Sequence, residues 1–242
     1  MSNSPAIPKL IHYCWFGNRE ISELGKRCID SWCRYLPEYE LVEWNENNFE
    51  VESIPFTKEA YIRGEFAFVS DYVRFWALYK YGGLYFDTDV EIIKPVDHII
   101  ACGPFMGAEH KNPMKGINPG LAMGAFPGMS VYKEVIDLFN SYTNDLWRKP
   151  KSEFTVVKVT TDVLIGHGLR NTKDIQTVNG INIYPQEFFC PMYYGSEMSE
   201  NTVSIHYFEG SWLNRWGKIK KYFRSKMPSR LITIFYRFKY KD

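Results

Sequence analysis

Residues 67–89 read AFVSDYVRFWALYKYGGLYFDTD, and this stretch decides the fold class of the chain. Its first part predicts a helix, because apolar side chains recur at spacings of three and four residues. Gly82 and Gly83 end the helix and turn the chain into an apolar strand, residues 84–86. That strand runs directly into two carboxylates separated by one residue.

The two carboxylates, Asp87 and Asp89, follow the strand at its carboxyl end. Open α/β sheets bind their ligands at this edge. Two hard oxygen donors suit a divalent cation that holds phosphates. Upstream, Asp71 and Arg74 are three residues apart and share one face of the predicted helix. The stretch therefore predicts a site for metal-bound phosphate.

An isolated Asp-x-Asp pair also occurs in proteins without such a site. It is often a solvated turn without a ligand. It also opens the DxDx[TV] motif of phosphatases and phosphotransferases, whose first Asp is a nucleophile. Here the fifth position is Glu91, where that motif needs Thr or Val. A metal-dependent phosphohydrolase is therefore the weaker alternative.

The flanking segments predict an open α/β sheet. Residues 10–15 predict a buried strand, residues 22–35 a helix and residues 40–44 a second strand, which together open a Rossmann-type nucleotide-binding sheet. We also predict a helix at 58–62, a continuation of the central strand at 90–95, a turn-rich segment shaping a substrate cleft at 103–128, and a helix at 130–147.

Composition predicts one catalytic domain and a tail. The 242 residues are 45% hydrophobic, enough for a single α/β core. The five cysteines are odd in number and lack CxxC spacing, which argues against a disulfide framework and a zinc site and favours a reducing compartment. No signal-peptide pattern opens the sequence, and no apolar run approaches the roughly 18 residues of a membrane span. We therefore expect a cytoplasmic protein.

The charge is unevenly distributed between the domain and the tail. Residues 213–242 hold ten Lys or Arg and one acid, a net charge of +9, so the total of +1 leaves −8 for residues 1–212. Aromatic and aliphatic residues alternate with these cations at near-helical spacing, interrupted by Pro228. Two interpretations stay open: peripheral contact with an anionic membrane, or a helix that packs on the domain. Nucleic acid is not expected as a partner, because no binding signature accompanies the cations.

Several ordered blocks resemble glycosyltransferase family 32, DxD-containing sugar transferases that include yeast-type mannosyltransferases and bacterial capsule and lipopolysaccharide enzymes. The blocks are IPKLIHYCWFG (7–17), Ser31-Trp32, Ser70-Asp71 with Arg74, YGGLY (81–85) before Asp87-Thr88-Asp89, and HYFEGSW (206–212). The resemblance implies a GT-A-like α/β domain over residues 1–212, with a Rossmann-type nucleotide-binding sheet and an acceptor-side subregion. Residues 213–242 are then a basic amphipathic tail.

The resemblance also implies a metal centre. Asp89 is the direct ligand, Asp87 contacts the metal or the ribose, and His206 is a further ligand, with Glu209 as its alternative. A lone histidine after a short strand is otherwise more often structural. A mixed carboxylate and imidazole set suits Mn²⁺ better than Ca²⁺, and Mg²⁺ is also acceptable.

For the donor nucleotide, the resemblance implies contacts from both ends of the domain. His12 and Trp15 lie near the base, Ser70 near the ribose, and Ser211 and Trp212 near the phosphates. Purely structural roles stay open, because Trp near a sheet is usually core and Ser70 can cap the helix.

For the donor sugar, the resemblance implies that Asp71 and Arg74 bind hydroxyl groups, with Arg74 also near the diphosphate. Asn118 would lie beside the donor sugar and the acceptor. The simpler roles are an intrahelical ion pair worth a few tenths of a kcal/mol and a turn-forming Asn before Pro119. Asp162 lies in a region that lacks the family's Gly-Pro pair, so any role for it is in doubt.

These observations predict a metal-dependent hexosyltransferase, and the resemblance to family 32 implies that it retains the anomeric configuration. A UDP-sugar is the expected donor, with GDP-mannose second, and the acceptor would be a hydroxyl of a surface polysaccharide or glycolipid. The tail would bring the protein to the inner face of the plasma membrane. The alternative from another class is a catalytically idle GT-A fold that binds nucleotide or carbohydrate.

Overall fold

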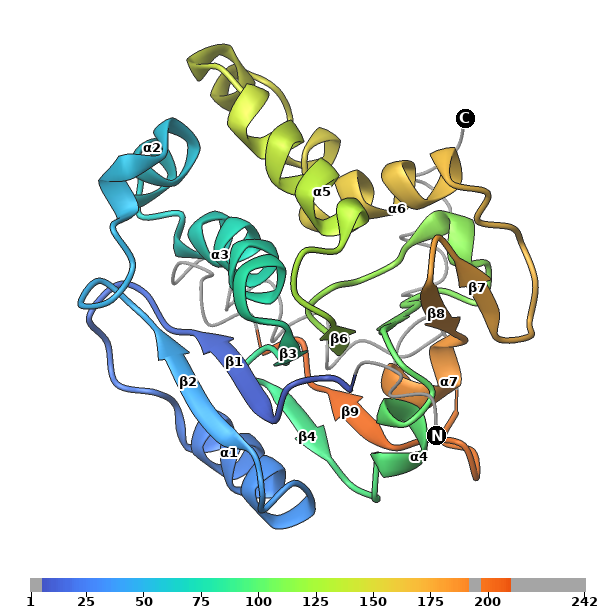
Figure 1. Cartoon of the computed structure of the whole chain (residues 1–242). Helices are drawn as coiled ribbons and strands as arrows, with labels where there is room; N and C mark the ends of the chain where they lie inside the picture. Colours follow the sequence, from blue (N-terminus) through green and yellow to red (C-terminus); the bar gives the residue numbers. More distant parts are fainter. Residues whose placement is uncertain (1–5, 192–196, 210–242) are drawn as a thin grey trace, which may run out of the picture. The chain divides into compact units, whose positions relative to one another are not determined.

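The structure is a computed structural model that describes residues 6–191 and 197–209. Its centre is a seven-stranded sheet with the order β2-β1-β3-β6-β5-β8-β7, in which only β6 and β7 run opposite to the other strands (Figure 1). The strands are β1 (Leu10–Cys14), β2 (Glu40–Trp44), β3 (Gly83–Tyr85), β5 (Phe105–Gly107), β6 (Met123–Ala125), β7 (Gln176–Val178) and β8 (Ile181–Tyr184). The predicted α/β class with a mostly parallel sheet is confirmed.

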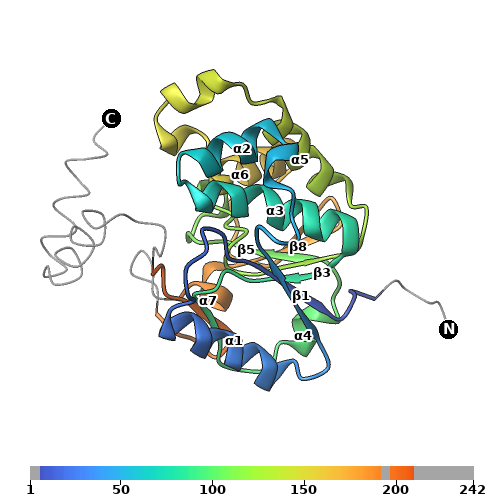
Figure 2. The same ribbon diagram turned by 90° about the vertical axis from the view of Figure 1, so that its left-hand side faces the viewer.

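Helices cover both faces of this sheet (Figure 2). One face carries α2 (Pro55–Ile62), α3 (Phe66–Tyr81), α5 (Ser130–Ser141) and α6 (Val156–Gly166). The other carries α1 (Glu23–Tyr35), α4 (Asp97–Ile100) and α7 (Gln186–Phe189). Short 3₁₀ turns are η1 (Val51–Ser53), η2 (Pro113–Lys115), η3 (Asn144–Arg148) and η4 (Lys151–Glu153). The sheet is therefore buried between two helical layers.

The connection from α3 to β3 depends on glycine. Gly82 has a φ of 65°, and its amide donates to Leu78 at 2.8 Å, which closes the last turn of the helix. A Cβ at this position would lie 2.7 Å from Pro127 and 2.9 Å from the carbonyl oxygen of Ala125. Backbone conformation and space both select glycine here, so the chain turns sharply into the central strand.

A second, two-stranded sheet lies beside the first. β4 (Val90–Ile92) pairs antiparallel with β9 (Ser204–His206), and Val90 lies opposite His206 (Figure 1). The indole of Trp32 in α1 donates to the Val90 carbonyl at 2.7 Å. This buried bond fixes β4 against α1, because breaking it would leave polar groups without a partner.

Three predicted elements differ from the observed ones. The strand predicted over 90–95 is not a continuation of β3 but the separate β4, because the chain turns at the two carboxylates. The segment 103–128, predicted as turns, contributes β5 and β6 to the middle of the sheet. The helix predicted over 130–147 ends at Ser141 and is followed by a 3₁₀ turn.

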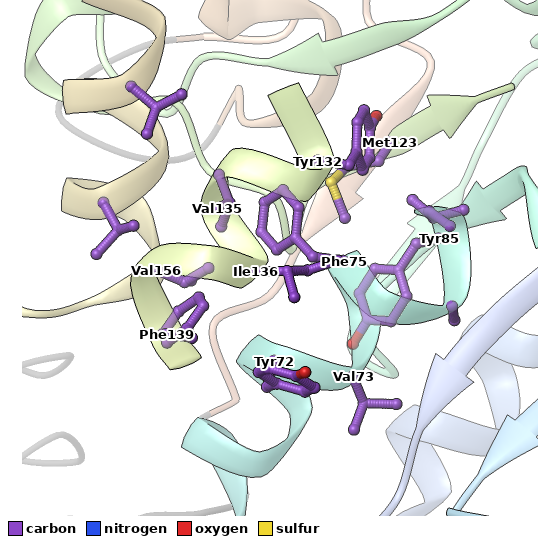
Figure 3. Close-up of a cluster of buried hydrophobic side chains, with 14 of the residues drawn as sticks. Tyr72, Val73, Phe75, Tyr85, Met123, Tyr132, Val135, Ile136, Phe139 and Val156 are labelled. Carbon is purple, nitrogen blue, oxygen red and sulfur yellow. The ribbon is translucent and has the colours of Figure 1, made fainter. Parts of the chain in front are cut away.

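A cluster of buried apolar side chains lies between α3, α5 and the sheet (Figure 3). The rings of Phe75 and Tyr132 are 5.5 Å apart, and those of Tyr72 and Phe139 are 6.3 Å apart. Aromatic pairs of this kind contribute about 0.5–1.5 kcal/mol each beyond the area they bury. The cluster holds α3 on the sheet, and α3 carries three of the predicted site residues, Ser70, Asp71 and Arg74.

All five cysteines lie within the described residues, and no disulfide joins any of them. Among the described residues, no helix is both long and apolar enough to cross a membrane. Ser211, Trp212 and the tail 213–242 lie outside the described residues, so the predicted division into a domain and a tail stays a prediction.

Candidate functional site

Asp87, Asp89 and His206 meet at one point of the fold. One ligand atom from each side chain lies within 4.8 Å of the other two. His206 Nε2 is 3.0 Å from Asp89 Oδ1 and 3.9 Å from Asp87 Oδ2. The side chains are 28%, 14% and 8% exposed, in the order Asp87, Asp89 and His206. The cluster is thus nearly buried but opens to solvent on the Asp87 side.

Strand β3 and the pairing of β4 with β9 bring these side chains together. β3 delivers Asp87 at its carboxyl end, and the turn after it delivers Asp89 just before β4. The pairing of β4 with β9 then sets His206 opposite Val90, the residue after Asp89. The Tyr207 amide donates to the Asp89 carbonyl at 3.0 Å and closes the arrangement.

The environment of His206 attracts positive charge. Burial by itself lowers the pKa of this imidazole, but the charges of Asp89 and Asp87 and the hydrogen bond to Asp89 raise the pKa overall. Two carboxylates and an imidazole form a donor set that Mn²⁺ accepts readily and Mg²⁺ accepts through its oxygens. The residues present therefore fit a divalent cation, and Asp87, Asp89 and His206 are the residues that would hold it.

Asp87 is oriented by its neighbours, so that its two oxygens have different surroundings. Its Oδ1 accepts from the Tyr85 hydroxyl at 3.0 Å and lies 3.3 Å from an Arg74 nitrogen. Its Oδ2 faces His206. The Arg74 guanidinium also lies 5.0 Å from the centre of the Tyr85 ring. Oδ2 is therefore the oxygen that Asp87 presents to the cluster.

Arg74 joins the two predicted parts of the site. It pairs with Asp71 at 2.9 Å as well as with Asp87, and its side chain is only 5% exposed. Burial alone would lower the pKa of Arg74, but Asp87, Tyr85 and Asp71 raise it, so the guanidinium stays charged. Burial raises the pKa of Asp71 to about 7, against the attraction of Arg74. The predicted intrahelical pair exists, and it also reaches the DxD motif.

Asn118 lies on the other side of Asp87. Its side-chain oxygen accepts from the Gly120 amide at 2.7 Å, and Gly120 accepts from the Asp87 amide at 3.0 Å. The Asn118 side-chain nitrogen donates to Glu109 Oε2 at 2.9 Å. Glu109 was not predicted from the sequence, because a single acid after a three-residue strand carries no motif signal.

The predicted base contacts have different surroundings. His12 is 1% exposed, and its ring nitrogens face the Gly82 carbonyl at 2.9 Å and the Trp44 indole nitrogen at 3.1 Å. Burial lowers the pKa of His12 to about 4, against the bond to Gly82. Trp15 is half-buried and donates to the Arg19 carbonyl. These contacts favour a structural role for His12, and contact with the base stays a prediction for both His12 and Trp15.

The remaining predicted residues are placed as follows. The Ser70 hydroxyl donates to the Phe66 carbonyl within α3 at 3.1 Å, so it does not cap the helix. Asp162 pairs with Lys158 on the surface of α6 at 2.6 Å. Ser211 and Trp212, predicted to contact phosphate, lie outside the described residues.

This chain is similar to known glycosyltransferases in sequence and in fold. Residues 22–106 match the family described as "Glycosyltransferase sugar-binding region containing DXD motif". Two relatives from Schizosaccharomyces pombe are similar over part of their length. Inositol phosphoceramide mannosyltransferase 3 is 36% identical over 116 residues, 41% of this chain and 29% of the relative. Inositol phosphoceramide mannosyltransferase 2 is 32% identical over 93 residues, 37% of this chain and 27% of the relative.

One solved structure, "PaToxG Glycosyltransferase", shares the fold with a TM-score of 0.51 and 19% identity, covering 66% of this chain and 69% of that one. The predicted GT-A-like fold and the resemblance to DxD-containing, family 32-like sugar transferases are thereby confirmed. The similarity to the two mannosyltransferases spans less than a third of their length. The family match, residues 22–106, includes Asp87 and Asp89.

Proposed function

We propose that this protein is a metal-dependent glycosyltransferase that moves a hexose from a nucleotide-sugar to an acceptor hydroxyl with retention of the anomeric configuration. The observation that carries the proposal is the cluster of possible metal ligands formed by Asp87, Asp89 and His206. Arg74 forms an ion pair with Asp87. This cluster lies at the carboxyl end of β3, and α/β sheets bind phosphate-bearing ligands at this edge.

In this proposal the chain's own residues prepare the departure of a nucleoside diphosphate. Asp87 Oδ2, Asp89 and His206 would hold the cation, which supplies positive charge against the leaving diphosphate. Arg74 adds a fixed charge that needs no reorganisation, because Asp71 and Asp87 hold it on both sides. Front-face departure and attack need no protein nucleophile, and we assign none.

The donor sugar would bind against the Asp71 and Arg74 face of α3, with Asn118 toward the acceptor. Trp15 would stack on the base, and Ser70 would lie near the ribose. Ser211 and Trp212 would close over the phosphates. Both Asp71 and Arg74 present little surface, which favours contacts from the tips of their side chains to one or two hydroxyl groups.

A UDP-sugar is the proposed donor, and a surface polysaccharide or glycolipid the proposed acceptor. The names of the two fission-yeast relatives favour mannose and an inositol-containing sphingolipid, which makes GDP-mannose the second candidate. The basic tail, residues 213–242, would bring the protein to an anionic membrane from the cytoplasmic side, where a lipid-linked acceptor is within reach. Manganese is the proposed metal, with magnesium second.

The test is nucleoside diphosphate release from a panel of UDP- and GDP-sugars, with Mn²⁺ or with EDTA. We compare the native chain with Asp89→Asn and with the control Asp137→Asn, a surface carboxylate paired with Lys133. We expect slow hydrolysis of one donor that EDTA abolishes and Asp89→Asn reduces by about 10²–10³-fold, the usual effect of losing one charge-stabilising group. The control should retain full activity.

Two results would contradict the proposal. Nucleotide binding without any release, also with added lipid and glycan acceptors, would favour an idle binding protein. Release of phosphate from simple monoesters without nucleotide preference would favour a phosphohydrolase.

A further inference from the structure

Glu109 follows β5 at the base of a loop beside the DxD motif. Its amide donates to the Gly116 carbonyl at 2.9 Å, and Ala108 forms a β-bridge with Ile117. The two ends of the loop 109–116 therefore lie side by side. The side chain of Glu109 is half-buried. A Cβ on Gly116 would lie 2.8 Å from Glu109 Cγ, so the loop backbone packs directly against this side chain.

The carboxylate of Glu109 sets the orientation of the Asn118 amide. Glu109 Oε2 accepts from Asn118 Nδ2 at 2.9 Å, and Asn118 Oδ1 accepts from the Gly120 amide at 2.7 Å. A carboxylate can only accept and a backbone N–H can only donate. The two partners therefore fix which way the Asn118 amide points.

The next contact in this series is with the candidate metal ligand. Gly120 accepts from the Asp87 amide at 3.0 Å. The space for a side chain on Gly120 is already filled, because a Cβ there would lie 2.0 Å from Asp87 Oδ2 and 3.1 Å from Asn118 Oδ1. Gly120 thus lies directly against the Asp87 oxygen that faces His206.

The Asn118 backbone has its own supports. Its amide donates to the Gly107 carbonyl at 3.0 Å, and the Ile117 amide donates to the Thr161 hydroxyl at 2.8 Å. Loss of Glu109 would therefore remove one of the two contacts of the Asn118 side-chain amide without releasing the backbone that carries it. This separation allows the role of Glu109 to be measured in a folded protein.

We propose that Glu109 is a positioning residue of the cation site, which acts through the Asn118 amide and Gly120 to hold Asp87 Oδ2 toward His206. The inference rests on the proposed function, because it needs Asp87, Asp89 and His206 to bind a divalent cation. It goes beyond that function by assigning a role to a residue outside the DxD motif. Partners that orient metal ligands change metal affinity by about 10–100-fold when removed.

The test is the Mn²⁺ affinity of the full chain, measured by titration with detection of free Mn²⁺ by electron paramagnetic resonance. Glu109→Ala and Asn118→Ala should each weaken binding by about 10-fold. The double variant should be no weaker than the weaker single variant, because both substitutions break the same series of contacts. Glu134→Ala, on the surface of α5 and paired with His167, is the control and should bind as the native chain does.

Two conservative variants separate the hydrogen bond from the charge. Glu109→Gln can still accept from Asn118 and should stay within about threefold of the native affinity. Glu109→Asp keeps the charge but is one methylene shorter, so it should lose about 10-fold, as Glu109→Ala does. Glu109→Asp also serves if Glu109→Ala fails to fold, which circular dichroism would show.

The possible results are distinct. If the losses of Mn²⁺ affinity multiply in the double variant, Glu109 acts independently of Asn118, and the inference is overturned. If Glu109→Gln binds Mn²⁺ as weakly as Glu109→Ala, Glu109 acts by its charge, and the inference is again overturned. Binding that Asp89→Asn abolishes but Glu109→Ala leaves unchanged would also overturn it, with the proposed cation site intact. A native chain that binds no Mn²⁺ would overturn the cation site and this inference together.

Discussion

His12 gives a quantitative test of whether its ring is structural or binds the nucleotide base. The structure supports the first role, because its ring nitrogens have partners in Gly82 and Trp44 and the side chain is 1% exposed. A ring that accepts from the Trp44 indole must carry its proton on the other nitrogen, so it is neutral. Protonation would break the Trp44 bond and bury a charge.

The size of the effect follows from the two pKa values of His12. Burial lowers the pKa from 6.5 to about 4, so the unfolded chain binds more protons than the folded chain between these values. Stability therefore rises with pH in this window and is lost as the pH falls below 6.5. Between pH 7 and pH 5 the loss from His12 alone is about 2 kcal/mol.

The assay compares urea unfolding of the native chain and His12→Gln at pH 5, 6 and 7. Glutamine can donate to the Gly82 carbonyl but does not titrate. Asp71 titrates in the opposite sense, because its pKa is raised to about 7 and its protonated form favours the folded state as the pH falls. The native curve alone is thus not diagnostic, and the difference between the two proteins isolates His12.

We expect His12→Gln to be less stable than the native chain at pH 7, with a gap that narrows by about 2 kcal/mol toward pH 5. Parallel stabilities across the range would refute the buried neutral ring. A large increase in the KM for the donor, without a change in the pH dependence of stability, would instead support a contact with the base.

Three further predictions concern groups around the site. Gly120→Ala should push Asp87 Oδ2 aside and weaken Mn²⁺ binding by about 10-fold, measured by the titration above. Trp32→Phe should cost about 1–3 kcal/mol in urea unfolding, because the buried Val90 carbonyl loses its donor; no change would show that water replaces the indole. Thr161→Val should cost a similar amount through the Ile117 amide, and Thr161→Ser, which keeps the hydroxyl, should restore most of it.

The sequence predicted the part of the site that lies on consecutive elements. Asp71, Arg74, Asp87 and Asp89 occur on a helix, a glycine turn and a strand whose periodicity and punctuation are visible in the chain. Their contacts follow from that local geometry, and Arg74 does reach Asp87 at 3.3 Å. The sequence did not predict the contact of Arg74 with Asp87, which depends on the path of α3 into β3.

The part of the candidate site next to β5 and β6 was less predictable, because these strands are short. β5 and β6 have three residues each and lie in a segment rich in Gly and Pro, so neither period nor length identified them. Glu109 therefore carried no signal as a site residue. The position of His12 within the motif block 7–17 suggested a nucleotide contact, whereas its tertiary contacts with Trp44 and Gly82 favour a structural role.

His206 shows why a motif can name a ligand but not place it. Its position depends on the register of β9 against β4, and a slip of one residue would turn the imidazole to the opposite face of that sheet. The register is held on both sides of β4: Trp32 binds the Val90 carbonyl, and Tyr207 donates from its amide to Asp89 and from its hydroxyl to Glu91 at 2.5 Å. None of these contacts is local in sequence. The imidazole therefore meets the carboxylates because α1 and the end of the described chain are fixed to the same short strand.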